Sequence, residues 1–151
     1  HEIDAYEILN DKEEELKRDS VPFTYSWNEQ NIFCKDRYIK DKKTYFIQYN
    51  KCWSREKETE FELYGNEENL PSFIEFEKNV LNVIENYPID KLIFDMRFNE
   101  GGSSSQGTRL IEKISQYKKV NKMGKLFVVI GRRTFSSAII NAMDNIKIKV
   151  R

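Results

Sequence analysis

Hydrophobic and polar residues are patterned differently in the two parts of this chain. In the first part, apolar positions recur at helical spacing over residues 3–18, and this predicts a helix. Short runs of aromatic and β-branched residues at 23–27 and 31–34 predict two strands, because such residues favour extended backbone and polar turns separate them. A third run at 44–49 predicts another strand, and the polar residues 40–43 before it fit a hairpin connection.

The second part alternates between helical and extended patterns. Helices are expected at about 71–87, 110–117 and 136–145, and strands at 91–96, 125–130 and 146–150. The run at 125–130 is almost continuously apolar, as expected for a strand buried on both faces. The order α-β-α-β-α-β predicts parallel strands joined by crossover helices. We therefore expect an α/β fold, with a helix and strand segment at 1–43 and the α/β core at 44–151.

Composition excludes several classes of protein. Aromatic residues make up 13% of the 151 residues, which is too many for a chain that never packs a core. No apolar run approaches the roughly 18 residues that a spanning helix needs, so we expect no membrane span. The 25 basic residues are balanced by 25 acidic residues, and without a basic excess we expect no nucleic-acid partner.

The rare residue types limit the chemistry further. The single histidine is His1, so a mechanism with an internal histidine base or a histidine-rich metal site is excluded. Cys34 and Cys52 are too few for a disulfide framework, and their spacing matches no metal motif. They either form one bridge or stay free, and we favour free thiols. We expect no metal and no cofactor.

Two turns lie where sites form in α/β sheets, between the end of a strand and the start of a helix. The first, at 95–103, contains Gly101 and Gly102, whose backbone can adopt positive φ and let a ligand approach the amides closely. Near a helix N-terminus such amides can hold a negative oxygen, although a glycine turn without a ligand is an equal alternative. The spacing matches neither a phosphate loop nor a dinucleotide-binding fingerprint.

The second turn, at 131–138, follows the most apolar strand and leads into a helix near Ser136. A serine in this position is an N-cap in one interpretation. In the other it is a nucleophile, and the following amide and the positive end of the helix stabilise the oxyanion that forms on attack. Position alone does not separate the two interpretations.

Together the two turns resemble a known family. Segment 91–102, Lys-Leu-Ile-Phe-Asp-Met-Arg-Phe-Asn-Glu-Gly-Gly, resembles the signature of the C-terminal processing (tail-specific) peptidases, a strand followed by Asp-Leu-Arg-x-Asn-x-Gly-Gly. Segment 125–143 resembles the nucleophile region of that family, with Thr-Phe-Ser-Ser at 134–137, and segment 45–50 resembles the strand before the core. The resemblance covers roughly residues 44–146 and depends on the order and separation of the motifs.

The resemblance implies a serine peptidase with a ClpP/crotonase-like core that cleaves a peptide or protein substrate through an acyl-enzyme. By position Ser136 matches the nucleophile, with Ser137 as the alternative. The oxyanion hole is then formed by the amide of Ser137 and by one amide from Gly101 or Gly102. Relatives are often exported, which suggests the cell envelope or secretion.

Three residues of the first turn are expected to support the site. Asp95 and Arg97 either orient the substrate or form an ion pair that braces the turn, and we expect the bracing role. Asn99 is expected to cap the turn with its own side chain.

The general base is missing from the matched segment. In the family a lysine serves, farther beyond the serine than this chain extends, and Lys147 and Lys149 lie at the wrong place in the pattern. We expect a truncated chain or an unordered base segment, ahead of lost activity. Ile139 also departs from the family, which often has an acidic residue there. The alternative function is a catalytically silent peptide-binding module of the same fold, and a crotonase-type acyl-CoA enzyme ranks third.

Overall fold

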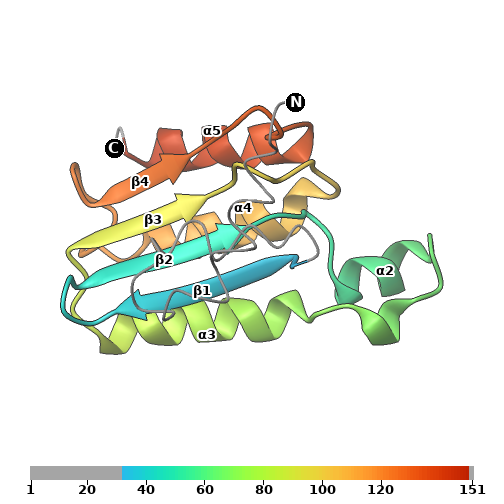
Figure 1. Ribbon diagram of the computed structural model, residues 1–151, viewed down its shortest axis with the longest axis horizontal. Coiled ribbons are helices and arrows are strands. Elements are labelled where there is room, and N and C mark those ends of the chain that lie inside the picture. The colour runs from blue at the N-terminus through green and yellow to red at the C-terminus, as the bar shows by residue number, and fades with distance from the viewer. Residues whose placement is uncertain (1–31, 150–151) are drawn as a thin grey trace, which may run out of the picture.

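A four-stranded sheet forms the centre of the protein in the computed structural model, which describes residues 32–149 (Figure 1). The strands lie in the order β1-β2-β3-β4, with bounds β1 Cys34–Ile39, β2 Thr44–Tyr49, β3 Lys91–Asp95 and β4 Leu126–Val129. β1 and β2 are an antiparallel hairpin, whereas β2, β3 and β4 are parallel. The protein is therefore a mixed α/β fold with a mostly parallel sheet, as its sequence predicts.

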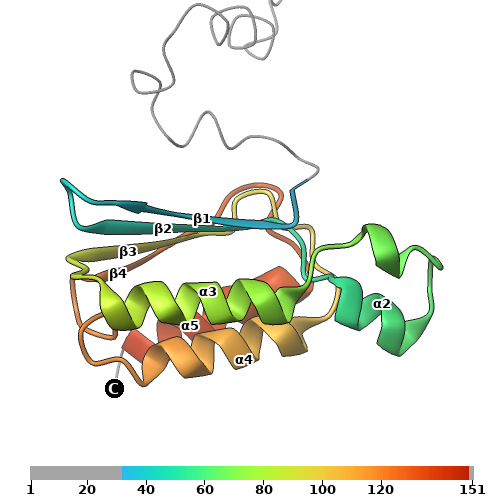
Figure 2. The same cartoon turned by 90° about the horizontal axis from the view of Figure 1, so that it is seen from below.

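Helices connect the parallel strands and cover one face of the sheet. α3, Phe73–Asn86, joins β2 to β3, α4, Ser104–Ser115, joins β3 to β4, and α5, Ser137–Lys149, follows β4. Figure 2 shows these three helices side by side on the same face. A short helix α2, Arg55–Phe61, and a 3-10 turn η1, Glu67–Asn69, lie beyond the carboxyl ends of the parallel strands. No helix in the described range 32–149 is long and apolar enough to cross a membrane.

The core lies between the sheet and these helices. Successive side chains of a strand point to opposite faces, so alternate residues of β2 and β3 meet the helices. The helices contribute the apolar positions that recur every three or four residues. The buried core includes Tyr45, Ile47, Tyr49, Leu92, Phe94, Phe73, Val80, Ile84, Leu110, Ile114, Ala138 and Ala142.

The strands at 44–49 and 91–95, the helix at 73–86 and the hairpin at 40–43 confirm the sequence predictions. The strand expected at 31–34 is wrong, because β1 begins at Cys34. Most of β1 carries charged or polar residues, and among the described strands it pairs only with β2, so it lies at an edge that tolerates them. The helix at 3–18 and the strand at 23–27 lie outside the described residues.

Two predictions near the end of the chain are also wrong. β4 pairs only with β3 among the described strands, and Phe127 is 40% exposed, so this strand is not buried on both faces. The segment expected as a strand at 146–150 continues α5 to Lys149. No glycine or proline follows Asn145 to end the helix, and an alternation of only a few residues does not outweigh helix propagation.

Candidate active site

Three chain segments meet at the carboxyl edge of the parallel strands. They follow β2, β3 and β4 and span residues 50–54, 96–103 and 130–137. The backbone of the second segment bonds to the first through Cys52 N and Gly101 O at 2.9 Å, and to the third through Phe135 N and Asn99 O at 2.9 Å. The glycine turn and the serine turn are thus adjacent, at the edge where ligands bind in open α/β sheets.

Ser136 sits directly against the glycine turn. A Cβ built on Gly101 would lie 2.8 Å from Ser136 Cβ and 3.3 Å from its Oγ, so only glycine fits there. Ser136 is exposed and has a φ of 52°, in the left-handed region that residues with a Cβ avoid. Such strain persists only where the surrounding structure enforces it, and a similar strained strand-to-helix turn presents the nucleophile in α/β-hydrolases.

The two glycines differ in what their amides do. Gly101 N donates to Asn99 Oδ1 at 3.0 Å, so this amide already has an acceptor. Gly102 N has no acceptor among the described residues, and Gly102 itself is exposed. A Cβ on Gly102 would lie 2.4 Å from Cys52 O, which explains a glycine with a φ of 129°. Of the two glycine amides, that of Gly102 is therefore the one that can bind a ligand.

The two serines of the second turn also differ. Ser137 is buried, and its Oγ donates to Gly102 O at 2.6 Å, which ties the start of α5 to the glycine turn. Its backbone amide lies in the first turn of the helix and has no acceptor among residues 32–149. No described residue bonds to the Oγ of Ser136. Ser136 therefore offers the accessible hydroxyl, and Ser137 offers an amide beside it.

An ion pair between Asp95 and Arg97 and a side-chain cap from Asn99 brace the turn after β3. Asp95 is buried and accepts from the Arg97 guanidinium through Nε and, at 2.7 Å, Nη2, as well as from Arg97 N at 3.0 Å. Asn99 Nδ2 donates to Tyr49 O at 2.8 Å, and its Oδ1 receives Gly101 N. These contacts use the side chains for support, and they fix the direction in which the Gly102 amide points.

A buried polar network under the turns is not predicted by the sequence. Asn141 Nδ2 donates to Ser104 O at 3.0 Å and thereby joins α5 to the start of α4. Cys52 Sγ lies 3.4 Å from Asn99 Oδ1 and 3.5 Å from Asn141 Oδ1. Gln106 Nε2 donates to Tyr49 Oη at 3.1 Å. A sequence signal for this network does exist. Asn141 and Gln106 are polar residues at positions where their helices otherwise carry apolar residues.

The cysteines are free thiols, as expected. Burial raises the pKa of Cys52 to about 11, although hydrogen bonds oppose the shift, and burial with the nearby Asp36 raises that of Cys34 to about 12. Both thiols are therefore protonated at neutral pH. The described residues contain no cluster of three side chains suited to hold a metal ion.

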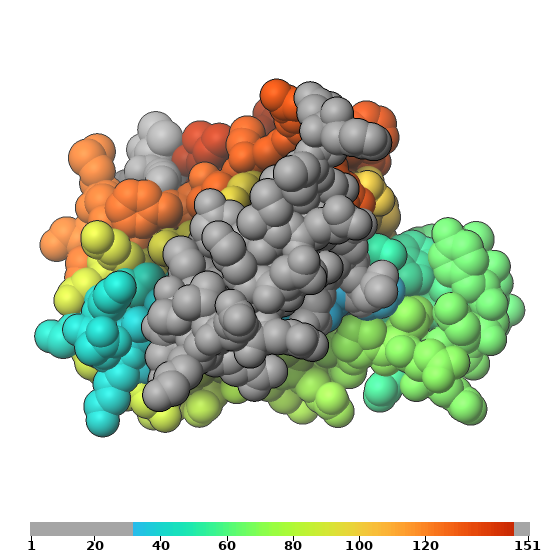
Figure 3. All heavy atoms as spheres, viewed as in Figure 1, coloured from blue at the N-terminus to red at the C-terminus, as the bar shows by residue number. Residues whose placement is uncertain are grey.

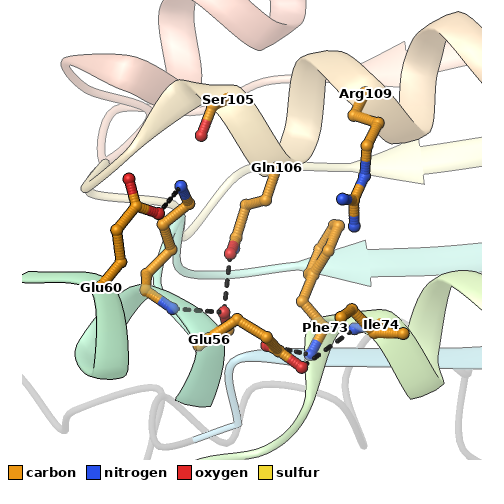
Figure 4. Close-up of a pocket in the computed structure, with 9 residues that line it drawn as sticks. Glu56, Glu60, Phe73, Ile74, Ser105, Gln106 and Arg109 are labelled. Atoms are coloured by element: carbon orange, nitrogen blue, oxygen red, sulfur yellow. Dashed lines mark hydrogen bonds and ion pairs between the residues drawn. The ribbon is translucent and has the colours of Figure 1, made fainter.

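A hollow of about 250 Å³ lies between α2, α3 and α4 (Figure 4). One of its two acidic residues, Glu56, caps α3, because its carboxylate accepts from Ser72 Oγ, from Phe73 N at 2.9 Å and from Ile74 N at 3.4 Å. These hydrogen bonds outweigh the effect of burial and lower the pKa of Glu56 to about 2. We interpret this hollow as a joint between helices.

No protein-family model and no curated protein matches this chain.

Proposed function

We propose that this chain carries the nucleophile and the oxyanion hole of a serine peptidase with a ClpP/crotonase-like core. The observation that carries the proposal is the exposed residue Ser136, whose backbone has a left-handed conformation and whose side chain lies against Gly101. The parallel strands with crossover helices and the resemblance to the tail-specific peptidases support the same assignment.

In this mechanism the Oγ of Ser136 attacks the carbonyl carbon of a peptide bond and transfers its proton to a base. The negative oxygen that forms accepts from the amides of Gly102 and Ser137, and such preorganised donors contribute roughly 3–4 kcal/mol each to the barrier. The C–N bond then breaks, and the amine leaves with a proton. Water hydrolyses the ester on Ser136 and restores the hydroxyl.

The base belongs to a part of the protein outside the described residues. No side chain of residues 32–146 bonds to the Ser136 hydroxyl. Lys147 and Lys149 lie on the last turn of α5, at the opposite end of the helix from Ser136. The resemblance assigns the base to a lysine beyond Arg151, whose pKa must fall so that it is neutral near pH 7.

A serine-reactive fluorophosphonate probe on the full-length protein tests the proposal. We expect covalent labelling of the wild type, loss of labelling in Ser136→Ala, and persistence of labelling in Ser105→Ala, because Ser105 is an exposed serine of α4. Ser137→Ala separates the two neighbours, and it should retain labelling because the Ser137 hydroxyl is bonded to Gly102 O. Labelling that survives Ser136→Ala contradicts the nucleophile assignment.

The absence of a described acceptor for Ser136 Oγ favours one second candidate, a silent peptide-binding module. A folded full-length protein that neither reacts with the probe nor cleaves peptides, yet binds them, supports this second function.

A further inference from the structure

An exposed aromatic and aliphatic surface lies beside the glycine turn. Phe61, Leu63 and Tyr64, at the end of α2 and in the loop after it, are 50%, 60% and 71% exposed. Trp53 stacks on Phe61 with ring centroids 5.8 Å apart, and it meets Tyr64 edge-on at 6.1 Å. The segment that carries these residues projects from one end of the molecule, drawn in green in Figure 3. We call Trp53, Phe61, Leu63 and Tyr64 the aromatic wall.

A buried carboxylate holds the aromatic wall in place. Glu58 is 1% exposed, and its Oε1 accepts from the amides of Tyr64 and, at 2.8 Å, Gly65. Its Oε2 accepts from Trp53 Nε1 at 3.0 Å. Burial acts to raise the pKa of Glu58, but these hydrogen bonds outweigh it and lower the pKa, so the group is charged at neutral pH. An exposed apolar loop is thus fixed in one conformation, which reduces the entropy lost when a ligand binds.

Three residues of the aromatic wall, Trp53, Leu63 and Tyr64, line a cleft of about 580 Å³ together with the glycine turn. Apolar and aromatic side chains line much of it, and its two charged residues are Lys51 and Glu100. Glu100 pairs with Arg133 at 2.7 Å, and Lys51 Nζ lies 5.0 Å from the centroid of the Phe33 ring. The cleft therefore extends from the aromatic wall to Gly101 and Gly102, the glycine turn that the proposed mechanism uses.

We propose that this cleft binds a large apolar or aromatic side chain of the peptide substrate, near the residue whose carbonyl reaches Ser136. The inference rests on the proposed function, because the shared glycine turn connects the cleft to the oxyanion hole. The volume of the cleft lies in the range of small-molecule sites. A small side chain would leave most of this volume unfilled. Offset and edge-on ring contacts with Trp53 and Tyr64 favour an aromatic occupant. The α2 segment thereby selects the substrate.

The test measures peptide binding in the absence of cleavage. Full-length Ser136→Ala protein is titrated into fluorescent heptapeptides blocked at both ends, alanine throughout except for a central Phe, Leu, Gly or Asp. Because the flanking residues are all alanine, the central side chain can settle in the cleft in any register. We expect the Phe and Leu peptides to bind at least about tenfold more tightly than the Gly and Asp peptides.

Two wall variants then locate the preference. Leu63→Ser and Tyr64→Ser change exposed side chains and should reduce the Phe-over-Gly ratio several-fold. Met123→Ser is the matched control, because Met123 is 89% exposed and lies before β4, at the opposite edge of the sheet. This control should leave the ratio unchanged.

The outcomes separate the two proposals. Three results overturn the cleft assignment: equal affinities for the Phe and Gly peptides, no measurable binding of any peptide, or a Phe-over-Gly ratio unchanged in both wall variants. None of them affects the nucleophile assignment, which probe labelling of Ser136 tests separately. A ratio that depends on Leu63 and Tyr64, in a protein whose Ser136 never reacts, supports the cleft and removes the peptidase.

Discussion

Replacing Gly102 by alanine tests the closest backbone approach in the candidate site. The new Cβ would lie 2.4 Å from Cys52 O and 2.8 Å from Cys52 C, both backbone atoms that cannot rotate away. The φ of 129° adds strain, because side chains rarely adopt this conformation. Conformational strain costs about 1–2 kcal/mol and overpacking about 1–3 kcal/mol, so we expect a loss of roughly 2–5 kcal/mol in the free energy of unfolding.

Gly124→Ala is the matched control for the conformational term. Gly124 also has positive φ, 78°, but nothing lies within 4 Å of the position of its Cβ. This variant should lose only the strain of about 1–2 kcal/mol. Equilibrium urea unfolding measures both variants, and an unchanged slope shows that the comparison is of stability alone.

The same pair of variants reports on the site. Where Gly102→Ala remains folded by circular dichroism, displacement of the amide should abolish probe labelling of Ser136, whereas Gly124→Ala should label like the wild type. Equal stability losses in the two variants would refute the close packing of residues 52 and 102, and normal labelling of folded Gly102→Ala would refute the use of this amide.

Three further predictions follow from the described contacts. Gly107→Ala should destabilise the protein by about 1–3 kcal/mol despite better helix propensity, because its Cβ would lie 2.2 Å from Asn141 Oδ1; in an Asn141→Ala background, urea unfolding should show no such loss. The pKa of Glu56 is lowered from 4.5 to about 2, so its carboxylate stabilises the fold fully above about pH 4.5 and less as the pH falls toward 2. The free energy of unfolding of Glu56→Gln should therefore depend less on pH in that window than that of the wild type. Equal dependence would contradict the α3 cap. Burial raises the pKa of Cys52 to about 11 and that of Cys34 to about 12, so both should react slowly with a disulfide reagent at pH 8 and rapidly in urea; fast reaction of the native thiols would contradict the burial.

The sequence determined the elements that depend on local signals. The strand at 44–49 and the helix at 73–86 follow from period and from flanking turn residues, and the parallel pairing follows from their alternation. The sequence did not reveal α2, because its residues 55–61 are mostly charged and have no clear apolar face. The misplaced strands at 31–34 and 146–150, and the edge position of β4, show that strand length and burial depend on neighbours in space.

For the candidate site, the resemblance of two motifs to the tail-specific peptidases named Ser136, Gly101 and Gly102. Only the tertiary structure shows that the Gly101 amide donates to Asn99 Oδ1 and that the Ser137 hydroxyl donates to Gly102 O. The second of these contacts joins residues 35 positions apart, and no local pattern encodes which carbonyl oxygen accepts from the Ser137 hydroxyl. Sequence fixes which groups are available, whereas the packing of three loops at one sheet edge decides which of them stay free, because each buried polar group must find a partner first.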